Sequence, residues 1–172
     1  MQLGLSECAR ATAASESKFR IDYPNSKPRT ALIIALDATS HEALKRHRSG
    51  VSPGTRFRRY VRTRRASSSL PVLTVDAVLA DDEGRETSLI DELMTADIVV
   101  MATAAGATPE AAEVIGNACF VAAKVSTGLV LRDGANEERT AATLLAMRPY
   151  STMLVISEGE DYVGEMLVAL RA

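Results

Sequence analysis

The sequence predicts an α/β protein: a three-layer sandwich around a mostly parallel, five-stranded sheet, either Rossmann-like or flavodoxin-like. Two observations support this fold class. Short apolar runs follow one another from Thr30 to Ile156, and amphipathic segments with helix start signals separate them. We expect an N-terminal arm at residues 1–29 and a single α/β domain at residues 30–172. This domain carries a basic insertion at about residues 45–69.

Five apolar runs are the expected strands. They are Thr30–Asp37, Pro71–Leu79, Asp97–Ala102, either Phe120–Val125 or Thr127–Leu131, and Thr152–Ile156. Runs without alternation of apolar and polar residues are typical of strands covered on both faces, as in parallel sheets flanked by helices. The acidic segment Asp81–Gly84 leaves two interpretations open. It closes a β-hairpin that runs from Val72 to Ser88, or it leads into a helix at Ser88–Met94.

The segments between these runs carry signals for the start of a helix. Capping-box spacing, in which side chain and backbone bind each other, occurs at Thr39–Glu42 and at Ser157–Glu160. A capping hydroxyl precedes a proline at Thr108–Pro109. Asn136 supplies a cap before two acids that suit the positive end of a helix. Strands and helices therefore alternate, which favours a doubly wound sheet.

The composition excludes several classes of protein. The 172 residues have a net charge of −2, with 47% hydrophobic and 24% charged residues, which is typical of one folded domain. Two cysteines without paired spacing do not indicate a disulfide or a zinc site. Two histidines exclude a three-histidine metal site within one subunit, and we expect no metal. No stretch approaches the ~18 apolar residues that span a bilayer, so we expect a cytoplasmic protein without a membrane partner. The sequence does not identify a cofactor.

Charge is distributed unevenly along the chain. Nine basic residues and no acid lie between Lys45 and Arg65, whereas residues 66–172 contain 17 acids and 6 bases. A helix fits Thr55–Arg65 better than a strand, because one helical face then collects Phe57, Tyr60, Val61 and Arg64. The side chains that we expect to bind an anion or to form an interface are Arg56, Arg58, Arg59 and Arg62.

Three partners suit this basic segment: the acidic remainder of a second copy, a small anionic ligand, or nucleic acid. Nucleic acid has the least support, because the acidic rest of the chain repels a long polyanion. The predicted C-terminal helix at residues 161–170 has a wider apolar belt than one sheet contact requires. We therefore expect a homo-oligomer.

Ligands of open parallel sheets bind beyond the carboxyl ends of the strands. The ligand-binding residues that this rule predicts are Asp37, Thr39, Ser40, Thr103, Gly106, Thr108, Gly134 and Ser157. Small residues around Gly106 allow a ligand to approach the backbone, and the helix that follows offers free N–H groups to an anion. The candidates for catalysis are Asp37, His41 and Asp133, and no nucleophile or metal motif completes them.

We therefore expect a small-molecule-binding domain that takes a nucleotide-like or phosphorylated anionic ligand at the carboxyl ends of the strands. The sequence assigns no catalysis to it. The alternative is an oligomeric interaction protein whose basic segment docks an acidic partner or, with less support, nucleic acid.

Overall fold

The computed structural model describes residues 29–48, 51, 53–66, 73–158, 163–165 and 167 of the chain. The predicted arm lies outside the described residues except for Arg29, and so do Glu160 and most of the predicted C-terminal helix. No helix within the described part of the chain is long and apolar enough to cross a membrane.

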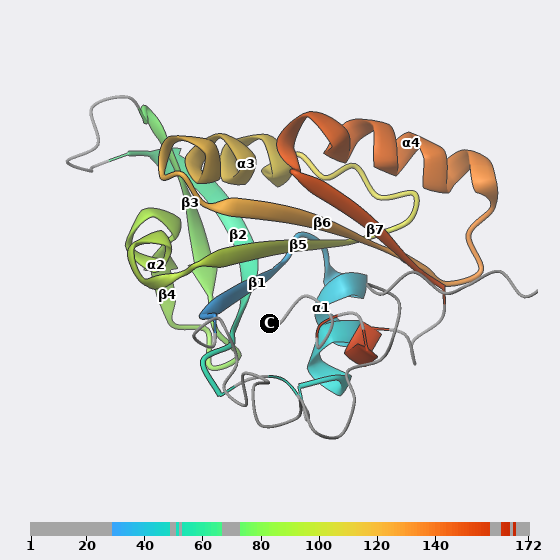
Figure 1. Ribbon diagram of the computed structural model, residues 1–172, viewed down its shortest axis with the longest axis horizontal. Coiled ribbons are helices and arrows are strands. Elements are labelled where there is room, and N and C mark those ends of the chain that lie inside the picture. The colour runs from blue at the N-terminus through green and yellow to red at the C-terminus, as the bar shows by residue number, and fades with distance from the viewer. Residues whose placement is uncertain are drawn as a thin grey trace, which may run out of the picture.

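The chain folds into a three-layer α/β sandwich, which confirms the predicted fold class (Figure 1). The sheet of the described residues has seven strands rather than the five predicted, in the order β4-β3-β2-β1-β5-β6-β7. The parallel strands are β1 (Ala31–Ala35), β2 (Arg56–Arg65), β5 (Ile98–Ala104), β6 (Val125–Arg132) and β7 (Met153–Glu158). The antiparallel strands are β3 (Val75–Ala80) and β4 (Glu86–Ser88).

The five parallel strands, numbered along the chain, lie in the order 2-1-3-4-5. This is the flavodoxin-like order, one of the two predicted. The order of the strands reverses between β1 and β5, so the carboxyl ends of these two strands form the switch point at which such folds bind ligands.

Helices cover both faces of the sheet (Figure 1). One buried core lies beneath α2 (Leu89–Thr95), α3 (Ala111–Val121) and α4 (Glu137–Met147). The second core lies beneath α1 (Ala38–Arg46) and the helical residues around Val163. The short helix η3 (Arg148–Tyr150) joins α4 to β7. Apolar side chains fill both faces of β1 and β5, as their unbroken apolar runs predict.

The basic segment forms strand β2, so the helix favoured for Thr55–Arg65 is wrong. β2 pairs in parallel with β1 and antiparallel with β3, with a bulge between Tyr60 and Arg62. Phe57 packs against the core beneath α1, and Tyr60 packs against the opposite core. Two apolar residues three positions apart therefore lie on opposite faces of a strand, where the helical interpretation placed them on one face.

Of the two interpretations of Asp81–Gly84, the hairpin is right, because this segment lies between the antiparallel strands β3 and β4. The helix α2 begins at Leu89, after β4 rather than directly after Gly84. Of the two alternatives for the fourth run, Thr127–Leu131 is right: α3 continues through Val121, and β6 begins only at Val125. Residues 120 and 121 are apolar although they lie on the exposed end of a helix.

The helix caps agree only in part with their prediction. Asn136 caps α4 as predicted, because its side chain accepts from the backbone N–H of Arg139. The capping box of α1 is formed by Asp37 and Ser40 rather than by Thr39–Glu42. α3 begins at Ala111, after a tight turn in which the N–H of Glu110 donates to the carbonyl of Thr108. Ser157 lies within β7, and its predicted partner Glu160 lies outside the described residues.

Candidate functional site

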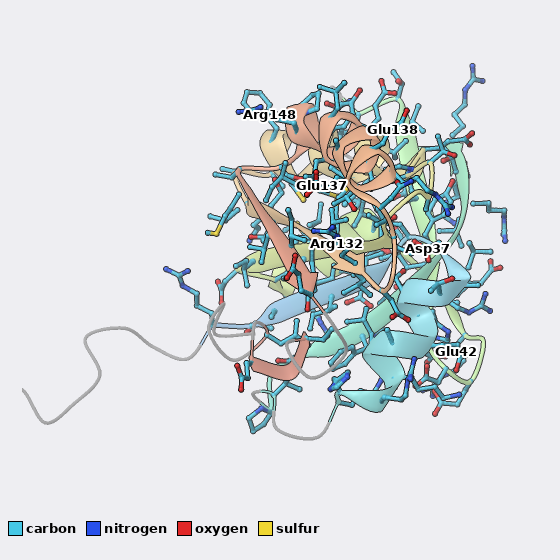
Figure 2. The ribbon with its side chains drawn as sticks, turned by 90° about the vertical axis from the view of Figure 1, so that its right-hand side faces the viewer. Asp37, Glu42, Arg132, Glu137, Glu138 and Arg148 are labelled. Atoms are coloured by element: carbon cyan, nitrogen blue, oxygen red, sulfur yellow. The ribbon has the colours of Figure 1, made fainter. Side chains whose placement is uncertain are left out.

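The carboxyl ends of the parallel strands meet at one edge of the sheet, which Figure 2 views from the front. The loops after β1, β5 and β6 and the end of β7 lie here, and with them the residues predicted to bind a ligand. We describe these residues from the switch point outward.

Asp37 joins the two strands of the switch point. Its Oδ1 accepts from the backbone N–H of Ser40 at 2.8 Å. Its Oδ2 accepts from the Thr103 hydroxyl and from the Ala104 N–H, both at 2.9 Å. Ser40 and Thr103 are completely buried. The structure thus brings three predicted ligand-binding residues together, and their polar groups bind one another.

Gly106 fits the sharp turn after β5. Its φ of +88° lies in the left-handed region, and a Cβ would approach the Nε of Arg139 to 2.6 Å. Its N–H donates to the hydroxyl of Thr143 on α4 at 2.8 Å. The positive φ and the close approach of α4 are the reasons why a glycine occupies this position. Thr108 lies exposed in the same loop.

The three candidates for catalysis lie at this edge but face different neighbours. His41 Nε2 lies 3.4 Å from Asp82 Oδ1, on the β3–β4 hairpin loop. Arg48 donates to both oxygens of Asp82. Asp133 is exposed beside Gly134, whose φ is +63°. The N–H of His41 donates to the carbonyl of Asp37 at 3.0 Å in the first turn of α1. The side chains of Asp37, His41 and Asp133, all of which the structure describes, share no hydrogen bond or ion pair.

The electrostatic environment of His41 favours the neutral imidazole. Partial burial lowers its pKa below the usual 6.5, and nearby arginine and lysine side chains add to this shift. The carboxylate of Glu42 opposes the shift. Among the described residues, no group of three or more acidic, histidine or cysteine side chains is arranged to hold a metal ion.

A small cavity of about 50 Å³ lies between α1 and the ends of β6 and β7. Its lining comes from four separate segments of the chain: Thr39, Ala43, Arg46, Leu131, Arg132, Asp133, Ser157 and Val163. Three of these residues, Thr39, Asp133 and Ser157, were predicted as site residues. Arg46 and Arg132 were not, although the position of Arg132 at the carboxyl end of an apolar strand was a usable signal.

Arg132 is held in place at the rim of this cavity (Figure 2). Its Nε donates to the carbonyl of Ala135 at 3.2 Å, and its Nη1 donates to Glu158 at 2.9 Å. The guanidinium group is therefore oriented by the loop after β6 and by the end of β7. Gly134, the remaining predicted residue, shapes that loop and does not line the cavity.

The arginines of β2 are largely paired within the chain. Arg58 and Arg56 both contact the buried carboxylate of Glu92 on α2, at 2.8 and 3.2 Å. Arg62 binds Glu86 on β4 with two hydrogen bonds. Arg64 binds the buried carboxylate of Asp76 on β3 at 2.9 Å. Arg59 is exposed, and no ion pair joins it to another described residue.

A larger groove, of about 560 Å³, lies between α4 and β7, away from the carboxyl edge. It is lined by Ala141, Leu144, Leu145, Arg148, Ser151, Thr152, Leu154 and Ile156. The sequence analysis missed this groove, because it took Thr152–Ile156 for a strand covered on both faces and made no prediction for the apolar side chains of α4. The outward position of Leu145 is the signal that a helical plot of α4 provides.

Comparison of the chain with protein-family models, curated proteins and solved structures returned no match. The functional argument therefore depends on the geometry of the described residues.

Proposed function

We propose that this protein binds a small ligand through an anionic group, which enters the cavity between α1, β6 and β7. The observation that supports this proposal is the convergence of two arginines and two hydroxyl residues from three elements on one cavity at the carboxyl edge. In flavodoxin-like sheets this edge is the usual place for a ligand.

The chemistry of the lining suits a phosphate or a carboxylate. Guanidinium groups bind such anions with charge-assisted hydrogen bonds, and hydroxyl groups add neutral donors. Arg46 and Arg132 supply the first kind of group, and Thr39 and Ser157 supply the second. The carboxylate of Asp133 at the rim accepts a hydrogen bond from a ligand hydroxyl, so a phosphorylated or carboxylated metabolite with free hydroxyl groups fits best.

The size of the cavity restricts the ligand further. Its volume of about 50 Å³ is far below the roughly 300–1,000 Å³ of pockets that enclose a drug-sized ligand. A single anionic group fits inside, whereas a whole nucleotide does not. The rest of the ligand would lie over the open edge of the sheet.

The alternative, an interaction protein that docks through its basic segment, has less support. Arg56, Arg58 and Arg62 contact carboxylates of the same chain, and the Glu92 that holds the first two is buried, whereas the Glu158 that holds Arg132 is 72% exposed. Binding an external anion would require it to compete with Glu92 and Glu86 at these positions. Arg59 is the predicted member of this set that remains exposed and without a described ion pair.

A thermal-shift titration with inorganic phosphate and a panel of phosphorylated and carboxylated metabolites tests the proposal. A free ligand concentration of ~100 times the dissociation constant adds about 2.7 kcal/mol to the free energy of unfolding and raises Tm. We expect Arg132→Gln to weaken binding about tenfold or more, because a charged hydrogen bond is lost.

The matched control for this experiment is Arg139→Gln. Arg139 lies exposed at the same edge but beside Gly106, outside the cavity. This variant should bind as the wild type does. The absence of a shift with every compound would overturn the proposal, and so would equal loss of affinity in the two variants.

A further inference from the structure

We propose that the chain forms a two-fold symmetric dimer, in which α4 and β7 of one copy pair with α4 and β7 of a second. The proposal is independent of the ligand-binding function. It begins from the place of β7 in the sheet: β7 is the last strand, and β6 is its only neighbour among the described residues. The outer backbone groups of this strand are therefore open to pairing with another strand.

The two edges of the sheet differ in how they resist such pairing. β4, at one edge, has three residues, and its Glu86 is held by Arg62. A short, charged strand of this kind is a common protection against edge-to-edge association. β7, at the other edge, has six residues, no lysine and no proline, and a single charge at its end. This edge lacks the usual protection, which favours a partner strand.

The surface beside β7 is apolar. Eight large hydrophobic side chains of the described residues are exposed, and four of them lie on α3, on α4 or on the α4 side of β7: Phe120, Val121, Leu145 and Ile156. Leu145 is the most exposed of those that line the α4–β7 groove, at 72%. Leu145 and Ile156 line the same groove, and exposed apolar patches mark interaction sites more often than an ordinary solvated face does.

The face of α4 that borders this groove carries a charge at each end. Glu137, Ala141, Leu144 and Arg148 follow one another at intervals of four, three and four residues, which places them along one side of the helix. Figure 2 shows Glu137 at the end of α4 nearer the viewer and Arg148 at the far end. Neither charge has an ion-pair partner among the described residues.

This pattern is complementary to itself. When two such helices pair antiparallel about a two-fold axis, Glu137 lies opposite Arg148 of the second copy. Ala141 then lies opposite Leu144 of the second copy. The reason is that the midpoint between residues 137 and 148 and the midpoint between residues 141 and 144 coincide, between Ala142 and Thr143. Each contact occurs twice, as a closed two-fold interface requires. The large side chain meets the small one, and opposite charges meet at both ends.

A second copy of this chain is therefore the occupant that the groove fits. The same two-fold arrangement places β7 beside β7 of the second copy with opposite direction, so that two short edges become one continuous sheet. Leu145 of each copy then enters the groove of the other. A different protein would have to reproduce the spacing of acid, small residue, leucine and arginine that α4 already contains.

The experiment is a charge exchange followed by sedimentation or light scattering between about 1 and 100 μM protein, where self-association depends on concentration. The wild type should show twice the mass of the chain. Arg148→Glu and Glu137→Arg should each raise the dissociation constant about tenfold or more, because like charges then meet. The double variant, with both substitutions, should restore the dimer.

Arg139→Glu is the matched control, since Arg139 is an exposed charge on the same helix but lies on the side away from the groove, beside Gly106. It should leave the mass unchanged, and circular dichroism should show that every variant is folded. A wild type that is still monomeric at about 100 μM, the highest concentration of the series, would overturn the proposal. Failure of the double variant to recover the dimer would also overturn it, as would equal weakening by the control.

Discussion

At the end of β1, one carboxylate organises the switch point of the sheet. Asp37 accepts hydrogen bonds from Ser40 in its own helix and from Thr103 and Ala104 at the end of β5. Its position after a buried strand could be predicted from the sequence. Its partners could not, because Thr103 lies 66 residues further along the chain, and local pattern carries no information about which distant strand is the neighbour.

Replacement of Asp37 by alanine should destabilise the fold. The substitution leaves the buried Thr103 hydroxyl and the Ala104 N–H without their acceptor and removes the cap of α1. We expect a loss of about 1–3 kcal/mol in the free energy of unfolding. Urea denaturation followed by circular dichroism measures this loss.

Thr39→Ala is the control for this measurement, because Thr39 is exposed in the first turn of the same helix. Its effect should stay within about 0.5 kcal/mol. Equal stability of the Asp37→Ala variant and the wild type would show that the three hydrogen bonds do not hold the switch point together.

At the scale of elements, β2 is where the prediction from sequence failed. Its apolar residues occur at helical spacing because both faces of the strand are covered, Phe57 by one core and Tyr60 by the other. Its many arginines appeared incompatible with a strand inside a sheet. The structure accommodates them because three carboxylates, on β3, β4 and α2, contact four of them. Such pairing becomes visible only when the register of the hairpin is known.

The ion pairs of β2 should differ in strength according to burial. Glu92 is 7% exposed and holds two arginines, whereas Glu86 is 45% exposed and holds one. Glu92→Gln should therefore lower the free energy of unfolding by about 1–3 kcal/mol, since it leaves Arg56 and Arg58 beside a neutral amide. Glu86→Gln should cost less than Glu92→Gln, because solvent screens an exposed ion pair.

The same substitution on neighbouring elements makes the two variants a matched pair. Urea midpoints of both, compared with the wild type at low and high salt, measure the difference. A cost for Glu86→Gln that equals or exceeds the cost for Glu92→Gln would contradict the assignment of Glu92 as the residue that attaches α2 to β2.

For the molecule as a whole, the fold class was predictable because buried parallel strands leave unbroken apolar runs in the sequence. β1, β5 and β7 carry such runs and were found. The basic strand β2 and the three-residue strand β4 carry none, and the sheet therefore has two strands more than predicted. Strand order depends on contacts between distant segments, and only the structure distinguishes the flavodoxin-like order from the Rossmann-like one.

The uneven charge of the chain also has a structural explanation at this scale. The nine basic residues between Lys45 and Arg65 precede a segment, residues 73–95, with seven acids and one base. The β2–β3–β4 meander and α2 bring these segments together, so that the charge of the first is balanced largely by the second. This internal balance reduces the need for an acidic partner or for nucleic acid, both of which the sequence alone left open.

The stability of the fold should depend on pH because His41 takes up a proton at different pH values in the folded and unfolded chain. Its pKa in the folded protein is lowered below 6.5, chiefly by partial burial, so the unfolded chain takes up a proton at higher pH than the folded one does. The resulting stabilisation is complete above pH 6.5 and decreases as the pH falls through the folded pKa. We expect the urea midpoint of the wild type to decrease when the pH is lowered from about 7.5 to 5.5, and that of His41→Asn to decrease less.

Carboxylates such as Glu86, whose pKa is lowered by its hydrogen bond to Arg62, lose their contribution to stability only below pH 4.5, outside this pH range. An identical pH dependence in the wild type and the variant would therefore exclude His41 as the titrating group.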